Sequence, residues 1–130
     1  MLKVNFESKD LQTEKIISAA IEVHRILGPG FLESIYEEAL CYELKLRNIE
    51  FKRQLLVPVT YKNLTIKKHR MDLVVENSVI VEIKAINYLP DIATAQTLSY
   101  LKALEYNKAL IINFGRKMLT NGIKRLSLSK

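Results

Sequence analysis

Two β-rich runs, at residues 64–75 and 79–85, flank the short polar turn Glu76-Asn77-Ser78, and this pattern constrains the fold more than any other part of the chain. Runs of apolar and β-branched residues joined by a short polar turn predict an antiparallel β-hairpin. Any fold proposed for this chain must therefore place these two strands side by side.

The segment after Phe51 predicts a third strand, because apolar residues alternate along it. The better-buried face of this strand is expected to consist of Leu55, Val57, Val59 and Tyr61. Pro58 interrupts the run, and proline is confined to edge strands and bulges because it cannot donate a ladder hydrogen bond. We expect a three-stranded meander in which this strand lies at an edge or contains a bulge.

Helical spacing of apolar residues precedes the meander. Residues 11–27 predict a helix with Asp10 as its N-cap, and Gly28-Pro29-Gly30 ends it. A second helix is predicted at residues 31–47. The residues spaced for one face of this second helix are Leu32, Ile35, Ala39 and Leu46.

The chain returns to helical spacing after the hairpin. Residues 92–105 predict a third helix, and residues 109–114 form a short apolar run suited to a buried strand. Asn121-Gly122 is a strong hairpin-turn signal, so a last strand through Leu128 is expected at one edge. The expected order is α-α-β-β-β-α-β-β.

The length of the hairpin loop decides which side chains share a face. If the loop is residues 76–78, Asp72 lies opposite Glu82 and Arg70 lies opposite Lys84, all on one face. A two-residue loop would instead pair Asp72 with Ile83. The three-residue register also aligns two apolar sets, Met71, Leu73 and Val75 with Val79, Val81 and Ile83.

This register brings two carboxylates together, with Cβ atoms roughly 5 Å apart. Like charges this close repel, and a hard divalent cation such as Mg²⁺ or Mn²⁺ would relieve the repulsion. Lys84, two residues from Glu82 on the same face, is placed to position or deprotonate an attacking water, or to hold a phosphate oxygen. The alternative is a surface salt-bridge cluster of Asp72, Glu82, Lys84 and Arg70, which spacing alone favours.

Five ordered segments between Leu11 and Arg125 resemble the GxxExxY proteins, a branch of the PD-(D/E)XK nuclease superfamily. The naming motif stands at Gly30, Glu33 and Tyr36, after the similar stretch 23–30. The other similar segments are Arg70 to Glu76, Val81 to Ala85, Ala95 to Leu101 with its Gln96-x-x-x-Tyr100 element, and Ile112 to Gly115 with Lys124-Arg125. Met71 stands where the superfamily has a nominal proline.

The resemblance implies an α/β fold with a restriction-endonuclease-like core, a mixed central β-sheet flanked by helices. It also implies metal-dependent hydrolysis of phosphodiester bonds in nucleic acid, with DNA as the expected substrate. The implied metal ligands are Asp72, Glu82, the main-chain carbonyl of Ile83, and Glu33 through a water or a second ion. The implied catalytic residues are Glu33, Asp72, Glu82, Lys84 and Gln96, the last orienting Lys84 or a phosphate.

Several of these residues also have a purely structural interpretation. An acid such as Glu33 in the first turn of a helix is favoured by the helix dipole, and Gln96 and Tyr100 share a helix face at i and i+4. Tyr36 fits a core aromatic with a satisfied hydroxyl, and His24 a packed, hydrogen-bonded histidine. With only two histidines in the chain, a zinc site is not expected.

Lys and Arg number 20 against 14 Asp and Glu, so the formal charge is +6, which suits a polyanionic partner. Basic residues cluster at 52–53, 67–70 and 116–117. We expect Arg53, Lys68, Arg70 and Tyr100 to contact nucleic acid, through sequence-independent contacts that salt weakens. The alternative for each cluster is a solvated surface.

A chain of 130 residues fits one domain, which we assign to residues 1–130. Cys41 is the only cysteine, which favours a reducing, cytoplasmic compartment. The N-terminus lacks the apolar core of a signal peptide, and no apolar run is long enough to cross a membrane. Two further hypotheses remain: a non-catalytic nucleic-acid-binding or protein-interaction module that keeps the nuclease fold, and a homodimer that cuts both strands of a duplex.

Overall fold

The computed structural model describes residues 3–4 and 10–129, and this part of the chain forms three α-helices, six strands and one 3₁₀ helix. In chain order these are β1 (Lys3–Val4), α1 (Leu11–Leu27), α2 (Glu33–Leu46), β2 (Phe51–Tyr61), β3 (Leu64–Val75), β4 (Val79–Lys84), α3 (Asp91–Leu104), β5 (Lys108–Asn113), η1 (Leu119–Gly122) and β6 (Ile123–Ser129). The predicted order is confirmed, and β1 adds a short strand before it.

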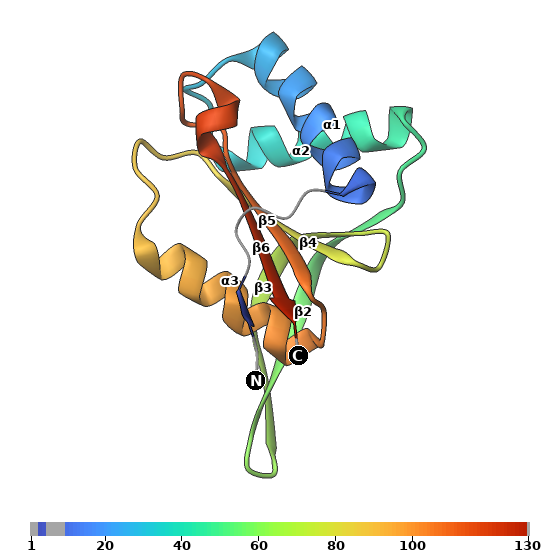
Figure 1. The fold of residues 1–130 in the computed structure, drawn as a ribbon, viewed down its shortest axis with the longest axis vertical. Coiled ribbons are helices and arrows are strands. Elements are labelled where there is room, and N and C mark those ends of the chain that lie inside the picture. Colours follow the sequence, from blue (N-terminus) through green and yellow to red (C-terminus); the bar gives the residue numbers. More distant parts are fainter. Residues whose placement is uncertain (1–2, 5–9, 130) are drawn as a thin grey trace.

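The strands form one sheet in the order β1-β6-β5-β4-β3-β2 (Figure 1). The pair β4 and β5 is parallel, and every other neighbouring pair in this sheet is antiparallel. Parallel neighbours need a crossover connection, and α3 provides it between β4 and β5. The predicted mixed sheet is confirmed.

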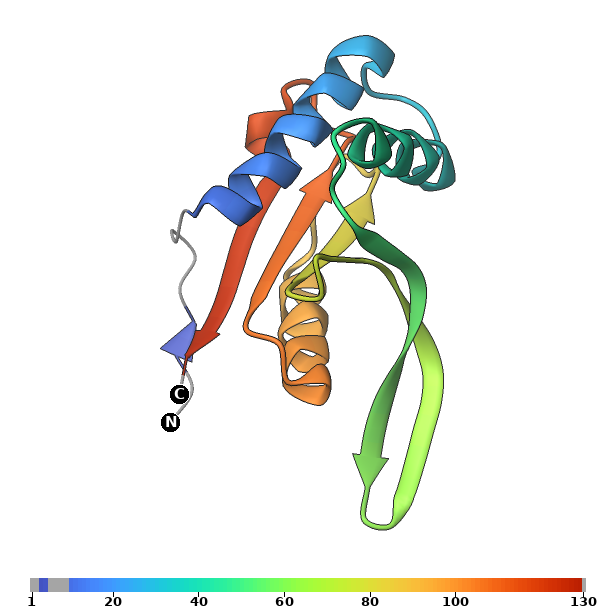
Figure 2. The same cartoon turned by 90° about the vertical axis from the view of Figure 1, so that its right-hand side faces the viewer.

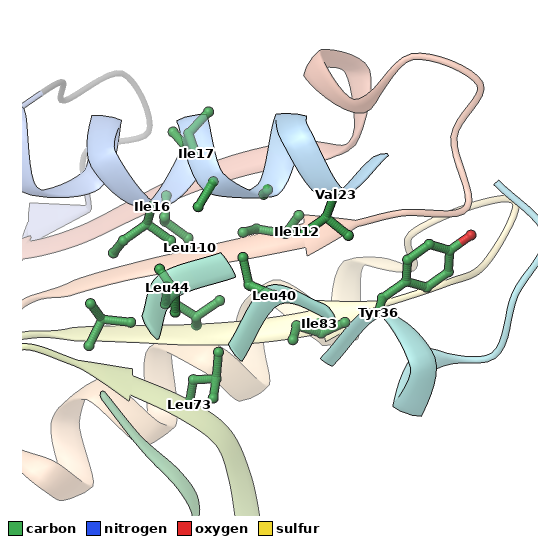
Figure 3. Packing of buried hydrophobic residues seen from close by; sticks show 14 of the residues in the cluster. Ile16, Ile17, Val23, Tyr36, Leu40, Leu44, Leu73, Ile83, Leu110 and Ile112 are labelled. Carbon is green, nitrogen blue, oxygen red and sulfur yellow. The ribbon is translucent and has the colours of Figure 1, made fainter. Parts of the chain in front are cut away.

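Helices cover both faces of the sheet, with α1 and α2 on one side and α3 on the other (Figures 1 and 2). Because strand residues alternate in direction, β4 is buried on both faces. Residues under α1 and α2 include Leu73, Val81, Ile83, Leu110 and Ile112, which contact Ile16, Val23, Leu40 and Leu44 (Figure 3). Val74, Ile80 and Ile111 lie under α3 and pack with its Leu101.

Helix α1 begins as predicted, because the side chain of Asp10 accepts a hydrogen bond from the Thr13 amide at 2.7 Å. Helix α2, however, is rotated from the predicted orientation. The residues assigned to its core face are partly or largely exposed, whereas Tyr36, Leu40 and Leu44 are fully buried. Both stripes have helical spacing, so the choice between them depends on packing against the sheet.

Strand β2 is buried along only part of its length. Val57 is fully buried, but Val59 is 45% and Tyr61 is 61% exposed, so the predicted face is only partly correct. The reason is that the outer halves of β2 and β3 project beyond the other strands and beyond α3 (Figures 1 and 2). Pro58 lies in the edge strand at a register shift between Val57 and Val59, as predicted.

The connection between β5 and β6 differs from the predicted tight turn. Asn121 and Gly122 belong to the 3₁₀ helix, and β6 is not at the edge because β1 pairs with it. A Cβ atom on Gly122 would collide with the main-chain carbonyl of Asn113, so close packing requires this glycine. None of the helices in the described part of the chain is long and apolar enough to cross a membrane.

Candidate active site

The β3–β4 hairpin has the three-residue loop that the sequence favoured. Val75 pairs with Val79 and Leu73 pairs with Val81, so residues 76–78 form the loop. Glu76 and Asn77 adopt the left-handed φ values of 52° and 53° that close it. The register therefore continues to Asp72 opposite Glu82.

At this position hydrogen bonds from main-chain amides to side-chain carboxylates replace the backbone hydrogen bonds between β3 and β4. The Asp72 carboxylate accepts a hydrogen bond from the Ile83 amide (Oδ2···N 2.7 Å), and the Glu82 carboxylate accepts one from the Asp72 amide (Oε1···N 3.3 Å). The last paired residues of the two strands are Leu73 and Val81. Each carboxylate is thus fixed to the opposite strand at the point where β3 separates from β4.

A kink in β2 accompanies this separation. Gln54 has a left-handed φ of 54° and lies opposite Asp72, between the pairs Arg53–Leu73 and Leu55–Met71. Beyond the kink the alternation of faces shifts: Met71 packs in the cluster under α3, not with Leu73 under α1 and α2. The predicted alignment of Met71 with the α1 and α2 face is therefore wrong, because it assumed an unbroken strand.

Burial makes ionisation of both acids unfavourable. Glu82 is only 6% exposed, and burial together with the Asp72 charge raises its pKa to about 7. Burial raises the pKa of Asp72 to about 6, and the charges of Glu37 and Glu33 add to this, although the hydrogen bond from Ile83 opposes it. A pair of this kind is stabilised by a proton or by a cation.

Lys84 lies close to this pair without forming an ion pair. Its charge lowers the pKa of Asp72 and of Glu82, in each case less than burial raises it. None of the ion pairs among the described residues involves Asp72, Glu82, Lys84 or Arg70. The interpretation as a surface salt-bridge cluster is therefore wrong, because these four residues take part in none of these ion pairs and Glu82 is buried.

Helix α3 contributes an aromatic residue to the site. The Tyr100 ring stacks on the His69 ring, with centroids 4.4 Å apart and planes 18° apart. Burial and the Glu82 charge raise the pKa of Tyr100, and burial and the Lys84 charge lower that of His69, so the stack borders the acids. The sequence singled out Tyr100, whereas it placed His69 only in the basic cluster 67–70. Gln96 is exposed one turn earlier on α3, and no hydrogen bond of the described residues joins it to Lys84.

Tyr36 and Gly30 of the motif have structural roles. The buried Tyr36 hydroxyl donates a hydrogen bond to the Gly28 carbonyl and accepts one from the Phe31 amide (3.1 Å), as predicted for a satisfied core tyrosine. Gly30 has a φ of 115°, which favours glycine. Together these residues shape the turn that places Glu33 in the first turn of α2.

Glu33 is exposed, and its charge raises the pKa of both site acids. The described residues contain no group of three His, Cys, Asp or Glu side chains arranged to hold a metal ion. Glu33 therefore does not complete a ligand set with Asp72 and Glu82 in this structure. His24 is a packed histidine as predicted, with Nε2 2.9 Å from the Arg116 carbonyl oxygen.

Sequence reasoning missed Glu37. This side chain is buried, and its carboxylate accepts hydrogen bonds from the guanidinium of Arg53 (2.7 Å) and the amide of Gln54 (3.0 Å). The contacts join α2 to β2 at the kink opposite Asp72. Arg53 also pairs with Glu38, so two carboxylates engage a residue expected to contact nucleic acid. The only signal in the sequence is that Glu37 follows Glu33 by one helical turn.

Asn113 fixes the chain that leaves β4 after Lys84. Its buried amide accepts a hydrogen bond from the Ile86 nitrogen (3.0 Å) and donates one to the Ile86 oxygen (2.9 Å). Gly115 packs against the same peptide, where an added Cβ would collide with the Ile86 backbone. These contacts hold the carboxyl end of β4 in place.

The donors at this site suit a hard divalent cation. One oxygen each of Asp72 and Glu82 binds a main-chain amide, and no hydrogen bond of the described residues reaches the other oxygen of either acid. In a strand the amide and carbonyl of one residue point to the same side, so the Ile83 carbonyl also faces β3. Two carboxylates, one carbonyl and waters are oxygen donors of the kind that Mg²⁺ binds.

A mixed sheet between helices, with an Asp and a Glu-x-Lys on the hairpin at its centre, defines the class of restriction-endonuclease-like nucleases. A family model described as the PD-(D/E)XK nuclease superfamily matches residues 10–126. The chain belongs to this superfamily, which supports a nuclease-type function. Searches of curated proteins and of solved structures gave no match.

Proposed function

We propose that this protein hydrolyses phosphodiester bonds in DNA with the help of Mg²⁺ or Mn²⁺. The observation that supports this most is the pair of Glu82, which is buried, and Asp72, which is half-buried, because main-chain amides hold both carboxylates at the end of a hairpin ladder. Within the superfamily, Gly30, Glu33 and Tyr36 support assignment to the GxxExxY branch.

The proposed ligands are the carboxylates of Asp72 and Glu82 and the carbonyl of Ile83. A bound divalent cation supplies Lewis acidity, which favours ionisation of water and offsets the charge of a phosphate. The protein keeps both acids in fixed positions through the amides of Ile83 and Asp72, so little reorganisation is required when substrate binds.

Lys84 supplies the positive charge nearest to these acids. We assign it to holding the attacking water or a phosphate oxygen, because its charge acts on both carboxylates without being paired to either. Glu33 is proposed to bind a water at the edge of the site, and Gln96 to orient Lys84 or a phosphate.

Lys68, Arg70 and Tyr100 are proposed contacts to nucleic acid. The proposed location is the cytoplasm, which the buried, free thiol of Cys41 supports.

Cleavage assays test this proposal directly. The purified protein is incubated with Mg²⁺ or Mn²⁺ and labelled linear, circular, branched and single-stranded DNA, and with matched RNA. The control is Glu82→Gln, which keeps an acceptor for the Asp72 amide but removes the charge. We expect cleavage of DNA by the wild type and loss of it in the variant, and equal activity of the two proteins would contradict the proposal.

The second candidate function is a non-catalytic nucleic-acid-binding or interaction module. The Asp72–Glu82 pair, which forms no ion pair within the described part of the chain, argues for the enzyme. A module without a cation gains nothing from two neighbouring acids that are shielded from solvent and of which Asp72 raises the pKa of Glu82. Calorimetry separates the two: no uptake of Mg²⁺ or Mn²⁺, with or without DNA, would favour the module. A symmetric dimer remains a proposal, and sedimentation of the protein with DNA tests it.

A further inference from the structure

The net positive charge of the protein arises from one ribbon. Residues 51–71 contain six basic residues, Lys52, Arg53, Lys62, Lys67, Lys68 and Arg70, and no Asp or Glu. Subtracting these six from the 20 basic residues of the chain leaves 14, which equals its 14 acids. The rest of the chain is therefore neutral by this count, and the +6 belongs to the β2–β3 ribbon.

The outer part of this ribbon is free of the sheet. Because the β3–β4 ladder ends at Leu73 and Val81, only β2 and β3 pair beyond it, as far as Tyr61 and Leu64. In both views its outer end projects past α3 and past the ends of the other strands (Figures 1 and 2), whereas its base packs on α3 through Val57 and the stack of His69 on Tyr100. We call residues 55–70 the arm.

Within the described part of the chain, the basic side chains of the arm have no acidic partners. Lys62, Lys67, Lys68 and Arg70 are exposed, and none of the ion pairs among the described residues includes them. Four unpaired charges of one sign on a two-stranded ribbon repel one another unless a polyanion lies alongside. Arg53, at the base of the ribbon, differs because Glu37 and Glu38 engage it.

The end of the arm is also apolar. Val59, Tyr61 and Leu64 are each between 45% and 61% exposed, and the Lys62 ammonium lies 5.4 Å from the centroid of the Tyr61 ring. A ribbon with apolar side chains at its end and lysines along it offers van der Waals contacts to base edges and charges to phosphates.

We propose that the arm binds duplex DNA by lying in its major groove, next to the site of cleavage. Paired strands are about 4.8 Å apart, and the major groove of B-DNA, about 12 Å wide, admits a two-stranded ribbon. The major groove of an RNA duplex is deep and narrow, so the same ribbon does not fit it. The arm's position beside the cut rests on the proposed function, whereas DNA binding by the arm does not.

The arm also sets a length for the substrate. Leu64 is eight residues from Asp72 along β3, so the arm extends roughly 27 Å beyond the acidic pair at about 3.4 Å per residue. At about 3.4 Å per base pair this is roughly eight base pairs. A duplex must therefore continue for about that length on one side of the cut to contact the whole arm.

Salt-dependent binding tests the arm. The full chain in EDTA is titrated into a 30-base-pair labelled duplex at several salt concentrations, and the variant Lys62→Gln/Lys68→Gln is compared with the control Lys15→Gln/Lys45→Gln, which changes two exposed lysines away from the arm. Each phosphate contact contributes about 0.9 to the magnitude of the slope of log K against log salt. The arm variant lacks two such contacts, so the magnitude of its slope should be smaller by about 2, and it should bind at least about tenfold more weakly at about 0.1 M salt. The control, with the same change of charge, should keep the wild-type slope.

An arm variant that keeps the wild-type slope, or a control that loses as much, would overturn the proposal, as would equal affinity for an RNA duplex. Circular dichroism of all variants checks that they are folded. Shortening the duplex below about eight base pairs on either side of its centre should reduce the difference between wild type and arm variant. Cleavage is measured separately with Mn²⁺. Binding through the arm without cleavage would refute the proposed nuclease activity but would support DNA binding by the arm.

Discussion

The side chain of Asp72 accepts a hydrogen bond from the main-chain amide of Ile83 at 2.7 Å, in the place where a backbone carbonyl of β3 would continue the ladder. This one contact ends the pairing of the two strands and immobilises an acid. It gives Asp72 a structural and a proposed catalytic role, and substitutions can separate them.

Replacing Asp72 with Asn should abolish cleavage while keeping the fold, because the amide oxygen of Asn still accepts from Ile83. Asp72→Ala should abolish cleavage too, but it also leaves a main-chain amide unsatisfied, at a cost of about 1–3 kcal/mol of unfolding free energy. Urea unfolding in EDTA at pH 5, where the repulsion is largely relieved, measures the difference. Equal stability of the two variants would show that the Ile83 contact is dispensable.

The metal-free protein should lose stability as pH rises between about 4 and 7. The folded pKa values of Asp72 and Glu82, about 6 and 7, lie above their usual values of 3.8 and 4.5, so the folded state binds more protons than the unfolded state in this range. The stability that protonation of these two acids contributes to the metal-free protein is fully present below about pH 4 and is lost by about pH 8. Urea unfolding of wild type and of Asp72→Asn/Glu82→Gln should show equal stability near pH 4 and a more stable variant at pH 8. A difference that does not change with pH would contradict the raised pKa values.

Metal binding should release protons below pH 7, because a cation binds the ionised carboxylates of Asp72 and Glu82. Apparent affinity for Mn²⁺ should rise from pH 5.5 to pH 7.5 and level off above it. Calorimetry in two buffers of different ionisation enthalpy counts the protons released per ion. We expect close to none at pH 8.5, and the same heat in both buffers at pH 6 would argue against these two ligands.

Arg53→Gln should destabilise the protein, because it leaves the buried carboxylate of Glu37 without its charged partner. Removing one member of a buried ion pair costs about 3–5 kcal/mol, and partial exposure of Arg53 reduces our expectation to about 2 kcal/mol. Arg25→Gln is the matched control: it removes the surface pair with Glu22, within one helix, and should cause no measurable change. Similar losses in both variants would mean that the Glu37 network does not fix α2 to β2.

Tyr36→Phe should affect stability, and Glu33→Gln should affect cleavage. Loss of the Tyr36 hydroxyl removes two hydrogen bonds in the turn before α2 and should lower the unfolding free energy by about 1–3 kcal/mol. Glu33→Gln, at an exposed position, should leave the fold unchanged and lower the rate of cleavage. Thermal unfolding and single-turnover assays measure the two effects. A fully active Glu33→Gln variant would reduce Glu33 to a helix-terminus residue.

Sequence reasoning predicted the centre of the hairpin correctly because two independent constraints agree there. The loop length and the matching of Leu73 and Val75 with Val81 and Val79 select one register. A slip by one residue would turn the apolar side chains of one strand to the opposite face of the sheet. The same reasoning failed for Met71, since a left-handed residue on the neighbouring strand, Gln54, shifts the alternation beyond Asp72. Nothing in the local sequence of β3 marks that shift.

The face of α2 and the burial of β2 were mispredicted for a similar reason. Both sides of α2 have apolar residues at helical spacing, and both halves of β2 alternate, so periodicity fits buried and exposed segments equally well. Which stripe is buried depends on where the sheet lies. Glu37 was overlooked because its partners Arg53 and Gln54 are distant in sequence and become neighbours only when α2 packs beside β2.

The sequence by itself determined the order of elements, the hairpin register and the acid, acid and lysine that share the hairpin, because these depend on local periodicity and turn length. Only the tertiary structure decided that Glu82 is buried and repelled by the half-buried Asp72, not part of a solvated surface cluster, and that the basic ribbon projects from the sheet. Burial and projection depend on which elements pack together, and that is a property of the whole chain.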